Sequence, residues 1–226
     1  MPEHVNAITW DESGQKFYES GVDHGVLYVM SSNAYPKGVA WNGLTGVTES
    51  PSGAEPSDFY ADNIKYASMR SAEDFGGTIE AYTYPDEFKQ CIGEASLVTG
   101  ATLSQQERKV FGFCYRTKVG HDTGGDDHAY KLHLVYGATA SVSERAYSTI
   151  NDSPELITFS WEFTTTPVNV SGFKPTSLIV IDSRTANAGA LAALEAKLYG
   201  TAASGSDAAV DGYLPLPDEV KTTLTV

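Results

Sequence analysis

The chain has 226 residues, with 15 Lys and Arg against 29 Asp and Glu, which gives a formal charge of −14. This acidic balance argues against a protein that grips nucleic acid or an anionic membrane through a basic surface. Hydrophobic residues make up 41% and aromatic residues 11%, enough for a real core, and the length fits one large domain covering residues 1–226.

Both halves of the chain are acidic, so we expect the acidity to be spread over the surface rather than held in a tail. No apolar run approaches the ~20 residues of a membrane helix, and no basic stretch followed by an apolar one is visible at the start. We therefore expect a soluble protein made in a cytoplasm, with no membrane partner.

The first half of the chain predicts an arm, short strands and one long loop. Residues 1–25 are expected to form an N-terminal arm, and residues 48–63 a long loop because Pro51, Gly53 and Pro56 interrupt the pattern. A weak helix is predicted to start near Ser71. The candidate strands here are Val26–Met30, Val39–Thr48, Ile64–Arg70 and Thr78–Tyr84.

The second half has clearer periodicity. Apolar and polar residues alternate over Phe111–Thr117, Ala129–Tyr136 and Thr158–Thr164, as expected of half-buried antiparallel strands. Ser177–Ile181 is apolar on both faces, which predicts a central strand. Between the first two lies KVGHDTGGDDH, residues 118–128, which we expect to be a long loop.

A helix is predicted over residues 185–199. Asp182 or Ser183 can cap it, and Gly200 stands where a helix commonly ends. A variable polar loop, 201–213, follows. The fold class is therefore mainly β with one or two helices, arranged as a β-sandwich or partly rolled barrel.

The search for chemistry finds no catalytic motif and no cofactor motif. The His and Asp residues of 121–133 could suggest a metal site, but they lack the spacing of a calcium loop, and a solvated hairpin turn explains them without a ligand. Cys91 and Cys114 are expected to be reduced and inert. Glu80 and Glu162 could form a glycosidase pair, although exposed acids on strands are commoner. We predict no metal, no cofactor and no enzymatic activity.

Five segments in the same order strongly resemble the major tail proteins that build the tail tube of long-tailed bacteriophages, especially phages of Gram-positive bacteria, and the likeness runs from about Trp10 to Val220. No single motif is diagnostic, whereas the ordered set is. The segments read YPKGVAWNGLTGVTESPSGAEPSDFYADNIKY, EAYTYPDEF, HAYKLHLVYGATAS, AYSTINDSPELITFSWEFTTTPV and YLPLPDEV.

This resemblance implies a structural subunit of the virion tail, assembled in the bacterial cytoplasm. Members of the family form hexameric rings that stack into a hollow tube, and DNA passes through the tube without being bound specifically. The other partners implied are the tape measure, tail terminator and distal tail proteins. An acidic wall suits such a conduit, because a basic wall would hold duplex DNA through counterion release.

We expect the long loops and one tryptophan to make contacts between subunits. Trp41 could instead belong to the core, and the 118–128 loop could be an inert surface loop. The alternatives for the whole chain are a carbohydrate-binding β-sandwich, a carboxylate-based hydrolase, and a tube subunit of a contractile tail or secretion system. The candidate contact residues are Trp41, Glu49, Glu55, Phe59, Tyr60, His121, Asp122, Asp126 and Asp127.

Overall fold

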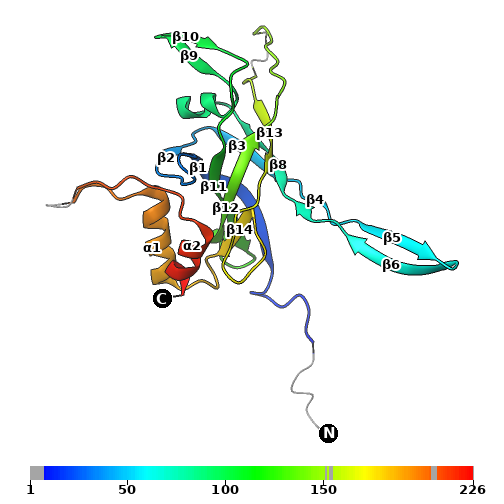
Figure 1. Ribbon diagram of the computed structural model, residues 1–226. Helices are drawn as coiled ribbons and strands as arrows, with labels where there is room; N and C mark the ends of the chain where they lie inside the picture. The colour runs from blue at the N-terminus through cyan, green and yellow to red at the C-terminus, as the bar shows by residue number, and fades with distance from the viewer. Residues whose placement is uncertain (1–7, 151, 153–154, 205–207, 226) are drawn as a thin grey trace.

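A computed structural model describes residues 8–150, 152, 155–204 and 208–225. It is mainly β, with two α-helices, one 3₁₀ helix and a large antiparallel sheet, which confirms the predicted fold class (Figure 1). The elements are β1 (Phe17–Val29), β2 (Gly38–Ala40), β3 (Leu44–Glu49), β4 (Ser52–Gly53), β5 (Pro56–Ala61), β6 (Ile64–Arg70), β7 (Glu73–Asp74), β8 (Gly76–Ala81), η1 (Asp86–Gln90), β9 (Ala95–Val98), β10 (Ala101–Leu103), β11 (Phe111–His121), β12 (Gly125–Ala140), β13 (Phe159–Thr165), β14 (Leu178–Asp182), α1 (Ala188–Tyr199) and α2 (Pro217–Leu224).

The main sheet has the strand order β2-β1-β11-β12-β13-β8-β3, and β14 also pairs with β12. β12 pairs with β14 through Lys131–Val135 and with β13 through Ala138–Ala140. Between these two stretches lies Gly137, whose φ of 62° is rarely adopted by residues that have a side chain. The chain therefore changes partner at a glycine, and β13, β8 and β3 fold over one face of the longer strands.

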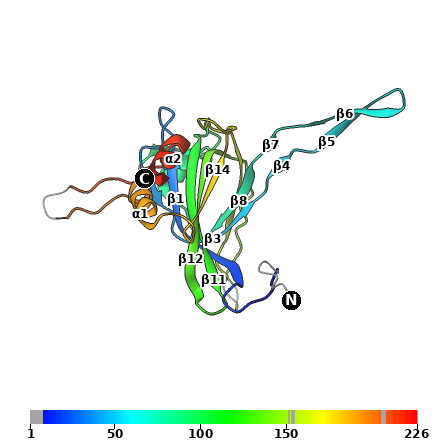
Figure 2. The ribbon, with the colours of Figure 1, turned by 90° about the horizontal axis from the view of Figure 1, so that it is seen from below.

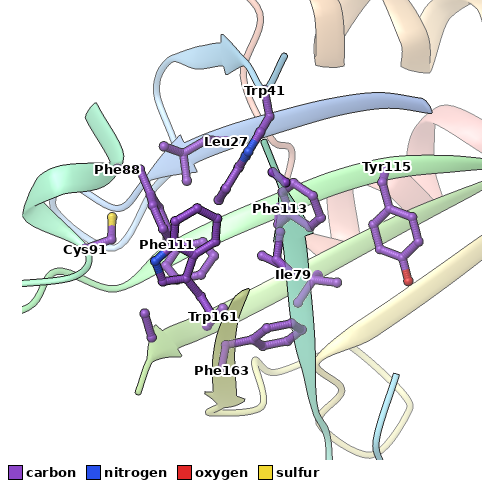
Figure 3. Close-up of a cluster of buried hydrophobic side chains, with 14 residues drawn as sticks. Leu27, Trp41, Ile79, Phe88, Cys91, Phe111, Phe113, Tyr115, Trp161 and Phe163 are labelled. Atoms are coloured by element: carbon purple, nitrogen blue, oxygen red, sulfur yellow. The ribbon is translucent and has the colours of Figure 1, made fainter. Parts of the chain in front are cut away.

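An aromatic core fills the space inside this rolled sheet (Figure 3). The ring of Trp41 lies 4.5 Å from that of Phe88 and 5.7 Å from that of Trp161. Phe111 and Phe113 of β11 face them, which explains the alternation seen in the sequence. The core thus joins both layers of the sheet to the short helix η1.

The opposite face of the long strands packs against α1 and α2. Leu191, Leu194 and Leu198 of α1 are buried against Leu134 and Tyr136 of β12 in a second core. α1 begins three residues later than predicted, because Asn187 rather than Asp182 or Ser183 accepts the hydrogen bonds of the first turn. Gly200 follows it with a positive φ, as expected.

Several local predictions are wrong. Residues 48–63 are not a loop but the end of β3, then β4 and β5, because β6 and β7 supply pairing partners for the last two. Residues 118–128 belong mostly to β11 and β12, which leaves only 122–124 as a turn. The described part of the 1–25 arm enters the sheet from Phe17 onward.

Two further corrections concern a helix and a strand. The residues after Ser71 form β7 and the start of β8, since Glu73 and Asp74 pair with β4 instead of starting a helix. β14 pairs only with β12 within the described chain, so it is an edge strand, with Val180 exposed on one face. A helix that was not predicted, α2, follows the second Leu-Pro step.

Candidate assembly surfaces

The most exposed apolar element is the hairpin β5–β6, here called the ribbon. It leaves the body beyond the small β4–β7 pair and projects away from the sheet (Figures 1 and 2). Its turn consists of Asp62 and Asn63, both with positive φ, the geometry that favours a two-residue hairpin. No other helix or strand of the described chain packs extensively against it.

Large apolar side chains cover the ribbon although nothing covers them. An isolated two-stranded hairpin is at best marginally stable in water, and an exposed apolar surface of this kind is typical of an interaction site. Two of the predicted contact residues, Phe59 and Tyr60, lie here, and Glu55 is exposed at its base. The exposed fractions are Phe59 50%, Tyr60 70%, Ile64 65%, Tyr66 77% and Met69 64%.

The two faces of the ribbon differ. Side chains of residues paired across the two strands lie on the same face. One face therefore holds three pairs: Ser57–Met69, Phe59–Ala67 and Ala61–Ile64. We call this the Phe59 face, and it carries no charged side chain. The other face carries Tyr60 and an ion pair in which Lys65 Nζ lies 2.7 Å from Asp58 Oδ1, which lowers the pKa of Asp58.

At the end of the β11–β12 hairpin, His121, Asp122 and Asp126 are engaged within the chain. His121 Nε2 lies 2.8 Å from the carbonyl oxygen of Gly14, and both carboxylate oxygens of Asp122 accept from the amide of the same glycine. Tyr18 donates to Asp126. These bonds hold the N-terminal segment against the hairpin.

The side chain of Asp127 is 83% exposed, and Lys118 Nζ lies 2.6 Å from its Oδ1. His128 stacks on His121, whereas His133 stacks on Tyr115. The described residues contain no group of three side chains placed to hold a metal ion.

Glu49 belongs to a polar cluster at the end of β3 where the ribbon begins. Its Oε1 accepts hydrogen bonds from His133 Nδ1 at 2.9 Å and from the Tyr115 hydroxyl at 2.5 Å. These bonds, with that from His133 the larger influence, hold the pKa of Glu49 below its ordinary value. Glu49 therefore connects the ribbon-bearing layer to the long strands, a role within the subunit that the sequence did not indicate.

Trp41 is not available for a contact between subunits. Its side chain is 3% exposed, lies in the aromatic core, and donates from Nε1 to the carbonyl oxygen of Thr83 at 3.0 Å. The alternative considered for this residue, core packing, is therefore correct. Its neighbours in sequence, Asn42 and Gly43, are exposed, and this misleads a local interpretation.

The layer formed by β13, β8 and β3 has an uncovered face without a basic residue. Its inward positions hold core residues such as Ile79, Trp161 and Phe163, so the intervening positions face outward. Apart from two glycines, Gly46 and Gly76, these outward residues carry hydroxyl or carboxylate side chains: Thr48, Thr78, Glu80, Ser160, Glu162 and Thr164.

The charge pattern extends beyond this face. Residues 38–64, 71–88 and 146–173 contain no Lys, Arg or His and together hold 12 Asp and Glu. The acidity is not held in a tail, as expected, and these three runs differ from the rest of the chain in having no basic residue to offset their acidic ones. The three runs can be read from the sequence, but only strand pairing brings them together.

The enzymatic alternatives gain no support from this geometry. Glu80 and Glu162 do occur on one face, in diagonal positions of β8 and β13, but the recess of about 520 Å³ beside Glu162 is not lined by Glu80. Cys91 and Cys114 are buried, and burial raises the pKa of each thiol to about 12, which leaves them protonated and unreactive.

No helix among the described residues is long and apolar enough to cross a membrane.

A recess of about 600 Å³ lies near the end of β8 that is farther from the ribbon. Its apolar lining includes Tyr82, Leu156, Ile157 and Phe159. It contains one acidic residue, Glu155, and no basic residue. The sequence did not predict this recess, because its residues come from two separate segments.

No protein-family model and no curated protein matches the chain. Among solved structures, it is similar to a chain of the sheath–tube complex of an extracellular contractile injection system, PVC, in the extended state, with 13% identity and a TM-score of 0.31 over 70% of this chain and 88% of that chain. It is also similar to a chain of the sheath/tube terminator of that system, with 14% identity and a TM-score of 0.30 over 73% of this chain and 97% of that chain. Scores this low carry no argument about assembly or partners.

Proposed function

We propose that this protein is a structural subunit of a tail tube, which assembles with its own copies into stacked rings around a channel for DNA. The single observation that carries the proposal is the ribbon, an apolar two-stranded element that extends from a folded body without a covering layer. A monomer gains nothing from such an element, whereas a self-assembling subunit can bury it against a copy.

The finer parts of the proposal follow from the resemblance of the sequence to major tail proteins of long-tailed phages, the Gram-positive phage type in particular. They are the hexameric ring, the role in the virion tail, assembly in the host cytoplasm, and contacts with tape measure, tail terminator and distal tail proteins. A tube subunit of a contractile tail or secretion system is the alternative within the same class.

We assign the channel wall to the outward face of β13, β8 and β3. Duplex DNA carries one negative charge per ~1.7 Å, so a wall with basic residues would retain it by releasing its counterions. This face presents hydroxyls and carboxylates, including Glu80 and Glu162, on strands that carry no basic residue. It therefore suits a polyanion that must slide past.

The first experiment asks whether the purified protein forms tubes. Electron microscopy and sedimentation of concentrated protein should reveal rings or hollow filaments. A variant in which residues 54–72 are replaced by a short turn should remain a folded monomer, because the ribbon has no extensive contact with the body. If the full-length protein stays monomeric under every condition, or forms tubes without its ribbon, the proposal is wrong.

The second experiment tests the channel wall by protection from labelling. The two native cysteines are buried, so an introduced cysteine is the only reactive one. In tubes, Ser160→Cys should resist a maleimide attached to a polymer too large for the channel, whereas the exposed control Glu107→Cys should react. Rapid labelling of Ser160→Cys in intact tubes would place this face outside the channel.

A further inference from the structure

The ribbon and the apolar recess lie at opposite ends of the same layer. The ribbon starts where Glu49 pairs with Gly77, and the recess begins at Tyr82, one residue beyond the pairing of Ala81 with Leu44. The ribbon points away from the body at its own end (Figure 2). A subunit therefore presents one apolar projection and one apolar depression, and the projection is directed away from its own recess.

We propose that the Phe59 face of the ribbon docks into the recess lined by Tyr82, Leu156, Ile157 and Phe159 of a second copy. This inference rests on the proposed function and names the contact that links one ring to the next. Both partners belong to this chain, so the docking needs no other protein.

The chemistry of the two surfaces matches. The Phe59 face offers Phe59, Ile64 and Met69 without a charge. The recess offers aliphatic and aromatic side chains beside two hydroxyls and the carboxylate of Glu155, and it has no basic residue. Burying these surfaces against each other removes apolar area from water and leaves no charge from the ribbon unpaired. A basic or acidic peptide would gain no ion pair from the ribbon face.

The opposite face of the ribbon can remain in water during this docking. Asp58 and Lys65 already neutralise each other at 2.7 Å, and Tyr60 is 70% exposed. One partner on one face is therefore sufficient, and the hairpin then resembles an antiparallel sheet with one buried and one wet side.

The length of the ribbon is sufficient for it to contact a second copy. The paired strand β5, Pro56–Ala61, spans about 20 Å at ~3.3 Å per residue, and the β4–β7 pair lies between it and the body. The strand β8, Gly76–Ala81, has the same length of about 20 Å by this measure. The ribbon thus projects beyond its own body by about the length of a strand of the layer (Figure 2), far enough to meet the recess end of β8 in a copy placed beyond it.

Disulfide trapping tests the contact directly. In the double variant Ile64→Cys with Leu156→Cys, both introduced cysteines are exposed and both native cysteines are buried. Mild oxidation of tubes should give a ladder of covalent oligomers, and the same protein diluted to monomer should give none. The matched control pairs Ile64→Cys with Leu97→Cys on the exposed β9–β10 hairpin, and each single variant controls for links between identical sites.

A charge substitution tests the energetics. Leu156→Glu introduces an unpaired charge into the recess, so the concentration needed for tube growth should rise about tenfold or more. Leu97→Glu, at a site that is also exposed, should leave this concentration unchanged.

The outcomes separate the two proposals. If the wild-type protein forms no tubes, the proposed function fails. If wild-type tubes form but Ile64→Cys with Leu156→Cys gives no ladder beyond the Leu97 control, or Leu156→Glu assembles like the wild type, the docking proposal is wrong while the tube subunit stands.

Discussion

The rolled body and the ribbon are both built from antiparallel hairpins with aromatic residues, yet the body buries them and the ribbon does not. Trp161 on β13 is 2% exposed, whereas Tyr66 on β6 is 77% exposed. The difference lies in the layers, because β13 faces β11 and η1, and β6 has only β5 beside it. Local pattern makes a strand, and a second layer decides whether the side chains of that strand are buried within the monomer.

The most direct test of this difference is to remove one aromatic side chain from the body and one from the ribbon. Trp161→Ala removes a ring packed 5.3 Å from that of Phe88 and should cost about 3–5 kcal/mol of unfolding free energy. Tyr66→Ala is the matched control and should leave the urea midpoint of the monomer unchanged. Equal losses at the two sites would show that the ribbon packs on the body in solution.

The next largest loss of stability is expected from a substitution of Gly137, the glycine at which β12 changes its pairing partner. A Cβ at Gly137 would lie 2.2 Å from the carbonyl oxygen of Thr166, and the φ of 62° adds strain. Gly137→Ala should cost about 2 kcal/mol or more. Gly100→Ala is the control, since its φ is also positive but no atom lies within 4 Å, so it carries strain without a clash. If both variants show the same urea midpoint, the corner at Gly137 is not tight.

A smaller loss of stability is expected when the ion pair between Asp23 of β1 and Arg116 of β11 is removed. Arg116 donates to Asp23 at 2.7 and 2.9 Å, and these bonds hold the pKa of Asp23 below its usual 3.8. Asp23→Asn should cost about 1 kcal/mol at neutral pH, since the pair is partly exposed.

The pH dependence of that effect has a definite sign. A depressed pKa contributes stability above the unfolded value and loses it as the pH falls through the folded value. The difference in unfolding free energy between the wild type and Asp23→Asn, measured with urea, should therefore become smaller below about pH 3.8. A gap that is constant down to pH 2 would mean that the carboxylate charge of Asp23 does not matter.

The smallest effect is expected within the ribbon. Lys65→Ala removes the exposed partner of Asp58, and solvent and salt screen such a pair. The thermal midpoint of the monomer should not change. A lowered midpoint would indicate that the ribbon contributes to the stability of the body.

Strand alternation was the reliable part of the sequence prediction. It located β11, β12 and β13, and Ile64–Arg70 is β6 with the same bounds. It failed where proline and glycine were taken as loop residues. Pro56 starts β5 at the edge of an isolated hairpin, where a missing amide does little harm, and Gly53 pairs in β4 with a positive φ.

The candidate contact residues were only partly accessible to sequence reasoning. Phe59 and Tyr60 are exposed, and their role in assembly remains a prediction. Trp41 was indistinguishable from them by local pattern, because its burial depends on Phe88 and Trp161, which are far away in the sequence. The helix α2 was missed although Pro217, Asp218 and Glu219 form a typical first turn, because only eight residues carry the signal.

If the ribbon of one copy docks into the recess of the next, as proposed, their placement at opposite ends of β8 determines how the polymer can be terminated. Every filament built this way is directional, with unfilled recesses at one extremity and bare ribbons at the other. A protein that seals the first must insert something apolar, and one that seals the second must offer a hollow. The two seals must therefore be unlike in shape, and an incoming subunit meets different chemistry depending on the extremity it approaches.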